Sequence, residues 1–316
     1  MKRLVVLAGA LLFAAQAFAQ YPNKSIRVVV PFPAGSATDT ITRILGASVS
    51  TAVGQTVVID NKVGADGAIA AADVAKAAPD GYTLLMATNS PMAAVPALKK
   101  NPPYDPVADF TPITDIGRYT FFLYVNAGLP IKNFQELVAY AKANPGKLNY
   151  ATGNTTGIVS FAQMNALTGI NMTHVPYKGE PQGITDLVGG RVHVMWATPT
   201  TGLAQVKDGK LRAVATNLKA RSRLVPDAPT MTEVGVPQYS VTSWAALFGP
   251  AKLPRDIQAR INKEFSDAMK RPDVIAAMDK QSFAMNPSTP EELGAFTKSQ
   301  MESYRSILRA AGVQPE

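Results

Sequence analysis

The stretch VVVPFPAGSATDTITRIL, residues 28–45, joins an apolar run to a turn of small residues and then to a helical pattern. The apolar run ends at Pro31, and apolar residues after Asp39 recur at intervals of three to four positions. A strand, a small-residue turn and a helix N-terminus together favour anion binding, because free helix amides and the helix dipole attract negative charge. The stretch therefore predicts an anion pocket at this loop.

The same order of strand, turn and helix continues through the N-terminal third of the chain. Strands are expected over 25–30, 56–60 and 83–87, and helices over 39–53 and 69–77. Strands that alternate with helices are typical of a doubly wound parallel sheet, in which ligands bind beyond the carboxyl ends of the strands. The sequences PFPAGSATD and ATNS both follow such ends, so both loops are predicted to face one crevice.

The pattern starts again after the Pro-rich segment 99–113. Strands are expected over 121–126, 148–151, 193–197 and 211–216, and helices over 134–143, 158–167 and 184–187, with further helices over 256–269, 274–280 and 290–310. We expect two α/β lobes, each a mainly parallel sheet flanked by helices, with the chain crossing between them more than once. Residues 20–121 and 241–316 are assigned to lobe 1 and residues 122–240 to lobe 2.

The first residues have the pattern of a secretory signal peptide. Lys2 and Arg3 precede an apolar segment over 4–15, and Ala17 and Ala19 form a small-x-small cleavage motif. The apolar segment is shorter than a membrane-spanning helix requires. We expect residues 1–19 to be removed after Ala19 and the mature chain to reside in a bacterial periplasm.

Composition excludes several classes of protein. Cysteine is absent, so an exported chain of this kind has no disulfides. Without Lys2 and Arg3 the chain has 29 basic and 23 acidic residues, a net charge of +6, and its basic residues are dispersed among acidic ones. A nucleic-acid partner is therefore not expected. A mild positive field can favour anionic small molecules.

Catalytic and metal-binding motifs are also missing. The two histidines, His174 and His193, lie in apolar strand contexts and in no HExxH motif, and no G-x-S-x-G sequence occurs. We expect no metal, no cofactor and no catalytic residue, and the chain is interpreted as a non-enzyme. The alternative is an exported hydrolase that uses a Ser or Thr of the loops with His174 as its base.

The first loop provides the first set of candidate ligand contacts, namely Phe32, Ala34, Gly35, Ser36, Thr38 and Asp39. Gly35 lets backbone amides approach a ligand, Ser36 and Thr38 offer hydroxyls, and Phe32 forms either a cleft wall or part of the core. Asp39 has two interpretations. As a helix cap or first-turn acid it accepts backbone hydrogen bonds, whereas as a ligand residue it would favour an ammonium group.

Four further loops complete the predicted pocket. Its other candidate residues are Thr88 and Ser90; Thr152, Asn154, Thr155 and Thr156; Tyr177 and Lys178; and Thr198 and Thr200. Lys178 would neutralise a distal carboxylate if it points inward, and the alternative is that it points to solvent. Neighbouring residues of a strand face opposite ways, so only one of Tyr177 and Lys178 is expected to line the cleft. Trp196 is expected in the core.

Six segments together resemble one family of transport proteins. They are YPNKSIRVVVPFPAGSATD, VVIDNKVGADGAIAAADVAKAAPDGYTLLMAT, PYDPVADFTPI, VPYKGEPQGITDLVGGRV, ARSRLVPDAPTMTEVGVP and LFGPAKLP. In this order and spacing the chain resembles the periplasmic solute-binding subunit of tripartite tricarboxylate transporters, the Bug or TctC-like family. It departs from the family in the first loop, where Ser36 replaces the second glycine of a pair, and in the Thr-rich loop TGNTTG.

The resemblance implies a two-lobed flytrap (periplasmic-binding-protein) fold, binding of a small organic carboxylate between the lobes, and delivery to membrane permease subunits. It implies no catalysis. A dicarboxylate and an aromatic monocarboxylate are both left open as ligands, and a monomer is expected. The same bound form could also serve a sensor receptor instead of a permease.

Overall fold

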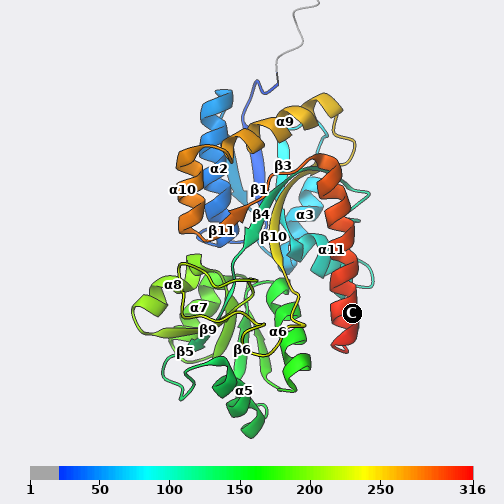
Figure 1. Ribbon diagram of the computed structural model, residues 1–316. Helices are drawn as coiled ribbons and strands as arrows, with labels where there is room; N and C mark the ends of the chain where they lie inside the picture. Colours follow the sequence, from blue (N-terminus) through cyan, green and yellow to red (C-terminus); the bar gives the residue numbers. More distant parts are fainter. Residues whose placement is uncertain (1–20, 316) are drawn as a thin grey trace, which may run out of the picture.

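The computed structural model describes residues 21–315, so the predicted signal peptide lies outside the described residues. Two sheets, each flanked by helices, lie one above the other (Figure 1). The first has six strands in the order β11-β4-β10-β3-β1-β2. They are β1 (Ile26–Val30), β2 (Val57–Asn61), β3 (Thr83–Thr88), β4 (Phe110–Tyr119), β10 (Ser243–Pro250) and β11 (Phe283–Met285).

Helices cover both faces of this first sheet (Figure 1). They are α2 (Ala37–Val53), α3 (Ala68–Ala75), α4 (Val95–Leu98), α9 (Arg255–Ala268), α10 (Pro272–Lys280) and α11 (Pro290–Ala310), with the short turns η1 (Ala65–Gly67) and η2 (Ser90–Ala94). Val28 and Val30 of β1 pack into the cluster that contains α2, whereas Val29 packs into the cluster that contains α3. Burial on both faces explains why this strand is apolar at successive positions.

The second sheet has five strands in the order β7-β6-β8-β5-β9. They are β5 (Phe122–Asn126), β6 (Asn149–Thr152), β7 (Thr173–Pro176), β8 (Val194–Ala197) and β9 (Leu211–Thr216). Its helices are α5 (Phe134–Ala143), α6 (Thr155–Thr168), α7 (Glu180–Val188) and α8 (Pro199–Lys207). Trp196 is buried in its core and stacks on Tyr239 at 5.5 Å between ring centroids.

The chain passes between the sheets at two places near each other. Only Thr120 and Phe121 separate β4 of the first sheet from β5 of the second. The chain returns through a long irregular segment that ends where β10 begins. Each sheet with its helices therefore forms a separate layered unit. The two connections between the units lie beside the loops that face the space between them.

The prediction of two α/β lobes with mainly parallel sheets is confirmed, because β1 to β4 point one way in the first sheet, β6 to β9 point one way in the second, and only a minority of strands run the other way. In the first sheet β10 runs antiparallel to β3 and β4, and in the second β5 runs antiparallel to β8 and β9. The sequence interpretation missed β4, β10 and β11. Among residues 21–315, no helix combines the length and apolar character needed to cross a membrane.

Candidate ligand-binding site

A small cavity of about 30 Å³ lies between the two sheets. The first sheet and its loops line it with Phe32, Ser36, Ala37, Thr38, Thr88, Asn89, Tyr119 and Ser243. Phe121 comes from the two-residue connection between β4 and β5, which we call the crossing segment. The second sheet and its loops contribute Asn154, Thr156, Glu180 and Thr198. Residues of both units surround this space, so a ligand held here would contact both.

The N-terminus of α2 faces this cavity. Ser36 is its N-cap and accepts a hydrogen bond from the amide of Asp39 at 3.3 Å, while the amide of Ser36 itself donates to Pro33. Within residues 21–315, the amides of Ala37 and Thr38 have no hydrogen-bond partner. These two residues line the cavity, so the first turn of α2 offers it free donors and the positive end of the helix dipole.

The N-terminus of α6 reaches the cavity from the second sheet. Asn154 is its N-cap and accepts from the amide of Gly157 at 2.9 Å. In the described part of the chain, the amides of Thr155 and Thr156 likewise have no partner. Two helix N-termini from different sheets thus converge on one small space, an arrangement that attracts an anion.

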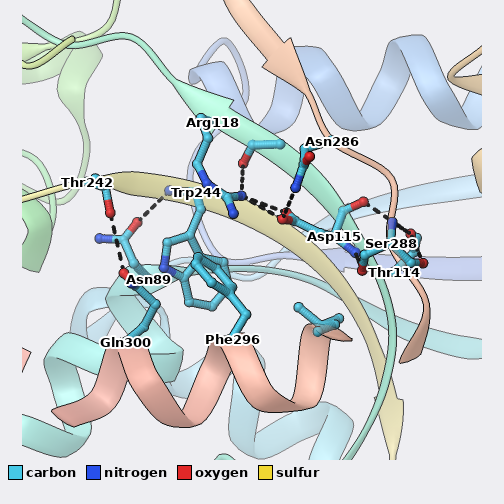
Figure 2. Close-up of polar contacts among 12 residues, drawn as sticks. Asn89, Thr114, Asp115, Arg118, Thr242, Trp244, Asn286, Ser288, Phe296 and Gln300 are labelled. Atoms are coloured by element: carbon cyan, nitrogen blue, oxygen red, sulfur yellow. Dashed lines mark hydrogen bonds and ion pairs between the residues drawn. The ribbon is translucent and has the colours of Figure 1, made fainter. Parts of the chain in front are cut away.

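Direct hydrogen bonds join the two units beside the cavity. Ser90 Oγ and Thr155 Oγ1 are 2.5 Å apart, and the Asn89 side-chain amide donates to Thr156 Oγ1 at 2.5 Å. The Asn89 carbonyl oxygen accepts from the backbone of Trp244 at 3.2 Å (Figure 2). Asn89 therefore fixes the end of β3 relative to β10 and to α6 at once.

Glu180 lies at the start of α7 with its carboxylate in the cavity wall. Its side chain is buried, and one oxygen accepts from the Thr198 amide at 3.0 Å, from the Thr198 hydroxyl at 2.6 Å and from Thr201 at 3.0 Å. Burial raises the pKa of the Glu180 carboxyl above its usual range, against these hydrogen bonds, which favour the ionised form.

Aromatic rings complete the lining on the side of the crossing segment. Tyr119, the last residue of β4, donates from its hydroxyl to Thr38 Oγ1 at 2.8 Å. Burial raises the pKa of Tyr119 far above its usual value, and the charge of Glu180 adds to this shift. Phe32 and Phe121 present apolar surface. Phe32 is 7% exposed, so it serves both the core and the cavity wall.

The structure brings part of the predicted site to the cavity. The predicted residues that line it are Phe32, Ser36, Thr38, Thr88, Asn154, Thr156 and Thr198. The predicted residues that do not line it are Ala34, Gly35, Asp39, Ser90, Thr152, Thr155, Tyr177, Lys178 and Thr200. Ala34 and Gly35 are exposed, and the Gly35 amide donates to the Asp39 carboxylate at 3.0 Å instead of pointing at a ligand.

Two predicted charged residues, Asp39 and Lys178, lie outside the lining of the cavity. Asp39 is buried in the first turn of α2 and accepts from Asn61 at 2.9 Å and from Arg43 at 3.1 Å. This corresponds to the first-turn interpretation of Asp39. Lys178 is exposed, so the inward orientation that would pair it with a distal carboxylate is not present.

Five other predicted residues bind neighbouring side chains. Tyr177 donates to Asp186 at 2.8 Å, and Thr200 donates to Gln281 of the first unit at 2.9 Å. Thr152 Oγ1 lies 2.7 Å from His174 Nε2. Ser90 and Thr155 pair with each other across the gap, as described above. Each of these side chains makes a hydrogen bond within the protein, and none of them lines the cavity.

Six lining residues were missed by the sequence interpretation. They are Ala37, Asn89, Tyr119, Phe121, Glu180 and Ser243. Asn89 lies between the two predicted residues of the ATNS loop, and Ala37 between two predicted residues of the first loop, so spacing alone could have included both. Tyr119 and Ser243 belong to strands that the interpretation missed. Glu180 carried one signal, an acidic residue at the start of a helix that follows a strand end.

Both histidines have structural partners. His174 stacks on Tyr150 with ring centroids 5.0 Å apart, and His193 Nδ1 accepts from the Asn149 amide at 2.8 Å. Burial lowers the pKa of both imidazoles. Neither residue lines the cavity. Among residues 21–315, no three His, Asp or Glu side chains gather in a way that could hold a metal ion.

Comparison with known proteins agrees with this architecture. The family model of the tripartite tricarboxylate transporter family receptor, TctC, matches residues 41–313. The structure of the periplasmic binding protein BugD is 31% identical, covers 94% of this chain and 100% of its own, and has a TM-score of 0.89.

Two similar structures were solved with carboxylates. R. palustris Rpa4515 with adipate is 30% identical over 94% of this chain and 100% of its own, with a TM-score of 0.90. MatC from Rhodopseudomonas palustris with bound malate is 29% identical over 91% of this chain and 100% of its own, with a TM-score of 0.86. The chain therefore belongs to the TctC (Bug) family of tripartite tricarboxylate transporter receptors, as its sequence motifs indicated.

Proposed function

We propose that this chain captures a small organic carboxylate in the periplasm, between its two lobes, and delivers it to the membrane permease of a tripartite tricarboxylate transporter. One observation carries the proposal. The first turns of α2 and α6 leave the amides of Ala37, Thr38, Thr155 and Thr156 without partners, and residues of both turns line one cavity. Amides at two helix N-termini that converge on one cavity favour a carboxylate, because they are fixed donors at the positive ends of the helix dipoles.

The proposed mechanism is closure of the lobes on the ligand. We assign residues 20–121 and 241–316 to one lobe and residues 122–240 to the other, because the strands of each sheet come from these segments. The ligand has contacts with both lobes only in the closed form, so its binding shifts the population toward closure. The permease then recognises the closed form. The predicted signal peptide favours export, and we propose that the chain acts as a monomer.

We further propose that the chain is not a hydrolase. A hydrolase requires a nucleophile and a base that face the substrate. Thr152 and His174 are within hydrogen-bond distance, but neither lines the cavity and His174 is stacked on Tyr150. Within the described residues 21–315, neither histidine nor cysteine lines the cavity.

Thermal unfolding tests the proposal. The protein is unfolded, dialysed and refolded to remove any bound ligand, and is then heated with a panel of di-, amino-, hydroxy- and aromatic carboxylates and the corresponding amides. A ligand present at 100 times its dissociation constant adds about 2.7 kcal/mol to the free energy of unfolding. We expect at least one carboxylate to raise the melting temperature while its amide does not. Equal shifts with acid and amide, or none with any acid, would contradict the proposal.

A further inference from the structure

Among residues 21–315, Glu180 is the only charged side chain in the lining of the cavity. The other lining residues contribute hydroxyls, amides, aromatic rings and a methyl group. A carboxylate in the wall of a site that captures carboxylates is unexpected, because like charges at close range in a low dielectric repel each other strongly. Its position therefore constrains which carboxylates can bind.

The two oxygens of Glu180 have different surroundings. One is fully occupied by three donors at the N-terminus of α8, namely the Thr198 amide, the Thr198 hydroxyl and the Thr201 hydroxyl. The other has a single long contact, from the Asn154 side-chain amide at 3.5 Å. An ionised carboxylate oxygen accepts about two hydrogen bonds, so this second oxygen has capacity left for a donor.

No cation balances Glu180 from within the lining. Arg43, the basic residue next to the first loop, is paired with Asp39 at 2.9 Å. Lys178, two residues before Glu180, is exposed and does not line the cavity. A ligand with two carboxylates would thus bring a second negative charge against an uncompensated buried one. A ligand with an ammonium group would instead supply the missing positive charge.

We propose that Glu180 determines specificity by accepting a hydrogen bond from an ammonium group of the ligand, so that the site prefers an amino-carboxylate to a dicarboxylate. This inference rests on the proposed function and deepens it. The ligand carboxylate is held by the amides at the α2 and α6 N-termini, and its ammonium group faces the free oxygen of Glu180. The carboxylate of Glu180 occupies the anion position at the N-terminus of α8, which leaves no place there for a second carboxylate of the ligand.

Matched probes test this inference by isothermal titration calorimetry on the refolded, ligand-free protein. Succinate is compared with 4-aminobutanoate, and adipate with 6-aminohexanoate, so that each pair shares its carbon number. We expect the dissociation constant of the amino-carboxylate to be at least 10-fold lower than that of its dicarboxylate partner. In Glu180→Gln this ratio should fall by at least 10-fold, because the amide side chain has no charge to pair with an ammonium group. Glu291→Gln, an exposed first-turn acid of α11, should keep the wild-type ratio.

The outcomes separate this inference from the proposed function. A dicarboxylate that binds the wild-type protein as tightly as its amino partner, or more tightly, overturns the role of Glu180 and leaves carboxylate capture standing. A ratio that is unchanged in Glu180→Gln also overturns it. The wild-type ratio decides the matter even if Glu180→Gln fails to fold. A protein that binds none of the carboxylates of the wider panel overturns the proposed function itself.

Discussion

Asp39 shows how a residue of the anion loop can serve the fold instead of the ligand. Burial by itself would raise its pKa, but hydrogen bonds from Arg43, the Gly35 amide and Asn61 outweigh burial, so the pKa of Asp39 lies below its ordinary value. The carboxylate thereby neutralises Arg43 and holds the loop against β2 through Asn61. The loop is thus shaped before a ligand arrives.

This pairing predicts a pH-dependent difference in stability. Because the folded-state pKa of Asp39 is lowered, its contribution is complete above the unfolded pKa of about 4 and is lost as pH falls through the folded value. We expect Asp39→Asn to lower the free energy of unfolding by about 1 kcal/mol at neutral pH. Urea unfolding from pH 7 to pH 3 should show this difference shrinking toward zero. Asp256→Asn, an exposed first-turn acid of α9, is the control, and a difference independent of pH would contradict the account.

The pKa of Glu180 is shifted in the opposite direction to that of Asp39. Its pKa is raised by burial, so the folded protein binds more protons than the unfolded chain between the ordinary glutamate pKa and the raised value. The free energy of unfolding of the wild-type protein should therefore decrease across this window as pH rises. Glu180→Gln lacks the ionisation and should not show this component of the decrease. Parallel urea-unfolding curves for the two proteins from pH 4 to pH 8 would argue that Glu180 is not a strained buried acid.

At the scale of elements, strand ends and helix starts were predictable from the sequence. The strands beside the connections between the two sheets, such as β4 and β10, were not. Short apolar runs bounded by turn residues identified β1, β3, β5 and β8 because both faces of these strands are buried. In contrast, β4 contains Pro112 and Gly117 and has register shifts against β10. Such breaks weaken local strand signals, and the pairing that stabilises them comes from distant parts of the chain.

The same difference between predictable and unpredictable strands explains which residues of the candidate site could be inferred from the sequence. Ser36, Thr38, Thr88 and Asn154 follow predictable strands, so their position near one crevice could be inferred from topology. Tyr119 reaches the cavity from β4, which could not be recognised. The direction of a side chain also cannot be predicted from the sequence. Thr200 and Tyr177, for example, donate hydrogen bonds to Gln281 and Asp186.

A partly buried ion pair helps to hold β4 in place. Asp115 is 3% exposed and accepts from Arg118 at 2.8 Å and from Asn286 at 2.9 Å, while Arg118 lies over the ring of Phe296 of α11 (Figure 2). These contacts join β4 to the segment after β11 and to α11. Because Tyr119 directly follows Arg118 and lines the cavity, these contacts lie close to the cavity wall.

Loss of Asp115 should loosen this arrangement. Asp115→Ala leaves the Asn286 amide without its acceptor, whereas Arg118 is partly exposed and remains solvated. We expect a loss of about 1–3 kcal/mol in the free energy of unfolding, measured by chemical denaturation. Asp279→Ala, an exposed aspartate of α10, should change it by less than about 0.5 kcal/mol. An Asp115→Ala protein as stable as the wild type would show that β4 does not depend on this cluster.

At the scale of the whole molecule, the closed arrangement depends on a few hydrogen bonds across the gap. The hydroxyls of Ser90 and Thr155 meet at 2.5 Å, and residues of both units line the cavity beside them. We expect entry and release of a ligand to require these contacts to break. Such a closure is the kind of two-state motion that a permease could recognise.

A disulfide across the gap should trap this state. The chain contains no cysteine, so Ser90→Cys with Thr155→Cys introduces one unambiguous pair. Oxidation without ligand should abolish binding of a carboxylate that the reduced variant binds, and oxidation with ligand should slow its dissociation by at least 10-fold. Stopped-flow tryptophan fluorescence or ligand retention on a desalting column measures both effects, with Ser90→Cys alone as control. Normal ligand exchange in the oxidised double variant would contradict closure at this contact.

The most direct test of the central claim removes one helix amide and little else. Ala37 is the first residue of α2, and its N-cap Ser36 has the extended conformation that a following proline requires. Ala37→Pro therefore deletes a cavity-facing donor at a position where helices accept proline. The measurement is the calorimetric dissociation constant of the carboxylate that stabilises the wild-type protein most. Arg255→Pro, at the first position of the remote helix α9, is the matched control.

A charge-assisted hydrogen bond contributes about 1.5–3 kcal/mol, so we expect Ala37→Pro to bind this carboxylate roughly 10- to 100-fold more weakly than the wild type. Arg255→Pro should bind it as the wild type does. A folded Ala37→Pro protein with wild-type affinity would contradict the claim that helix N-terminal amides hold the ligand.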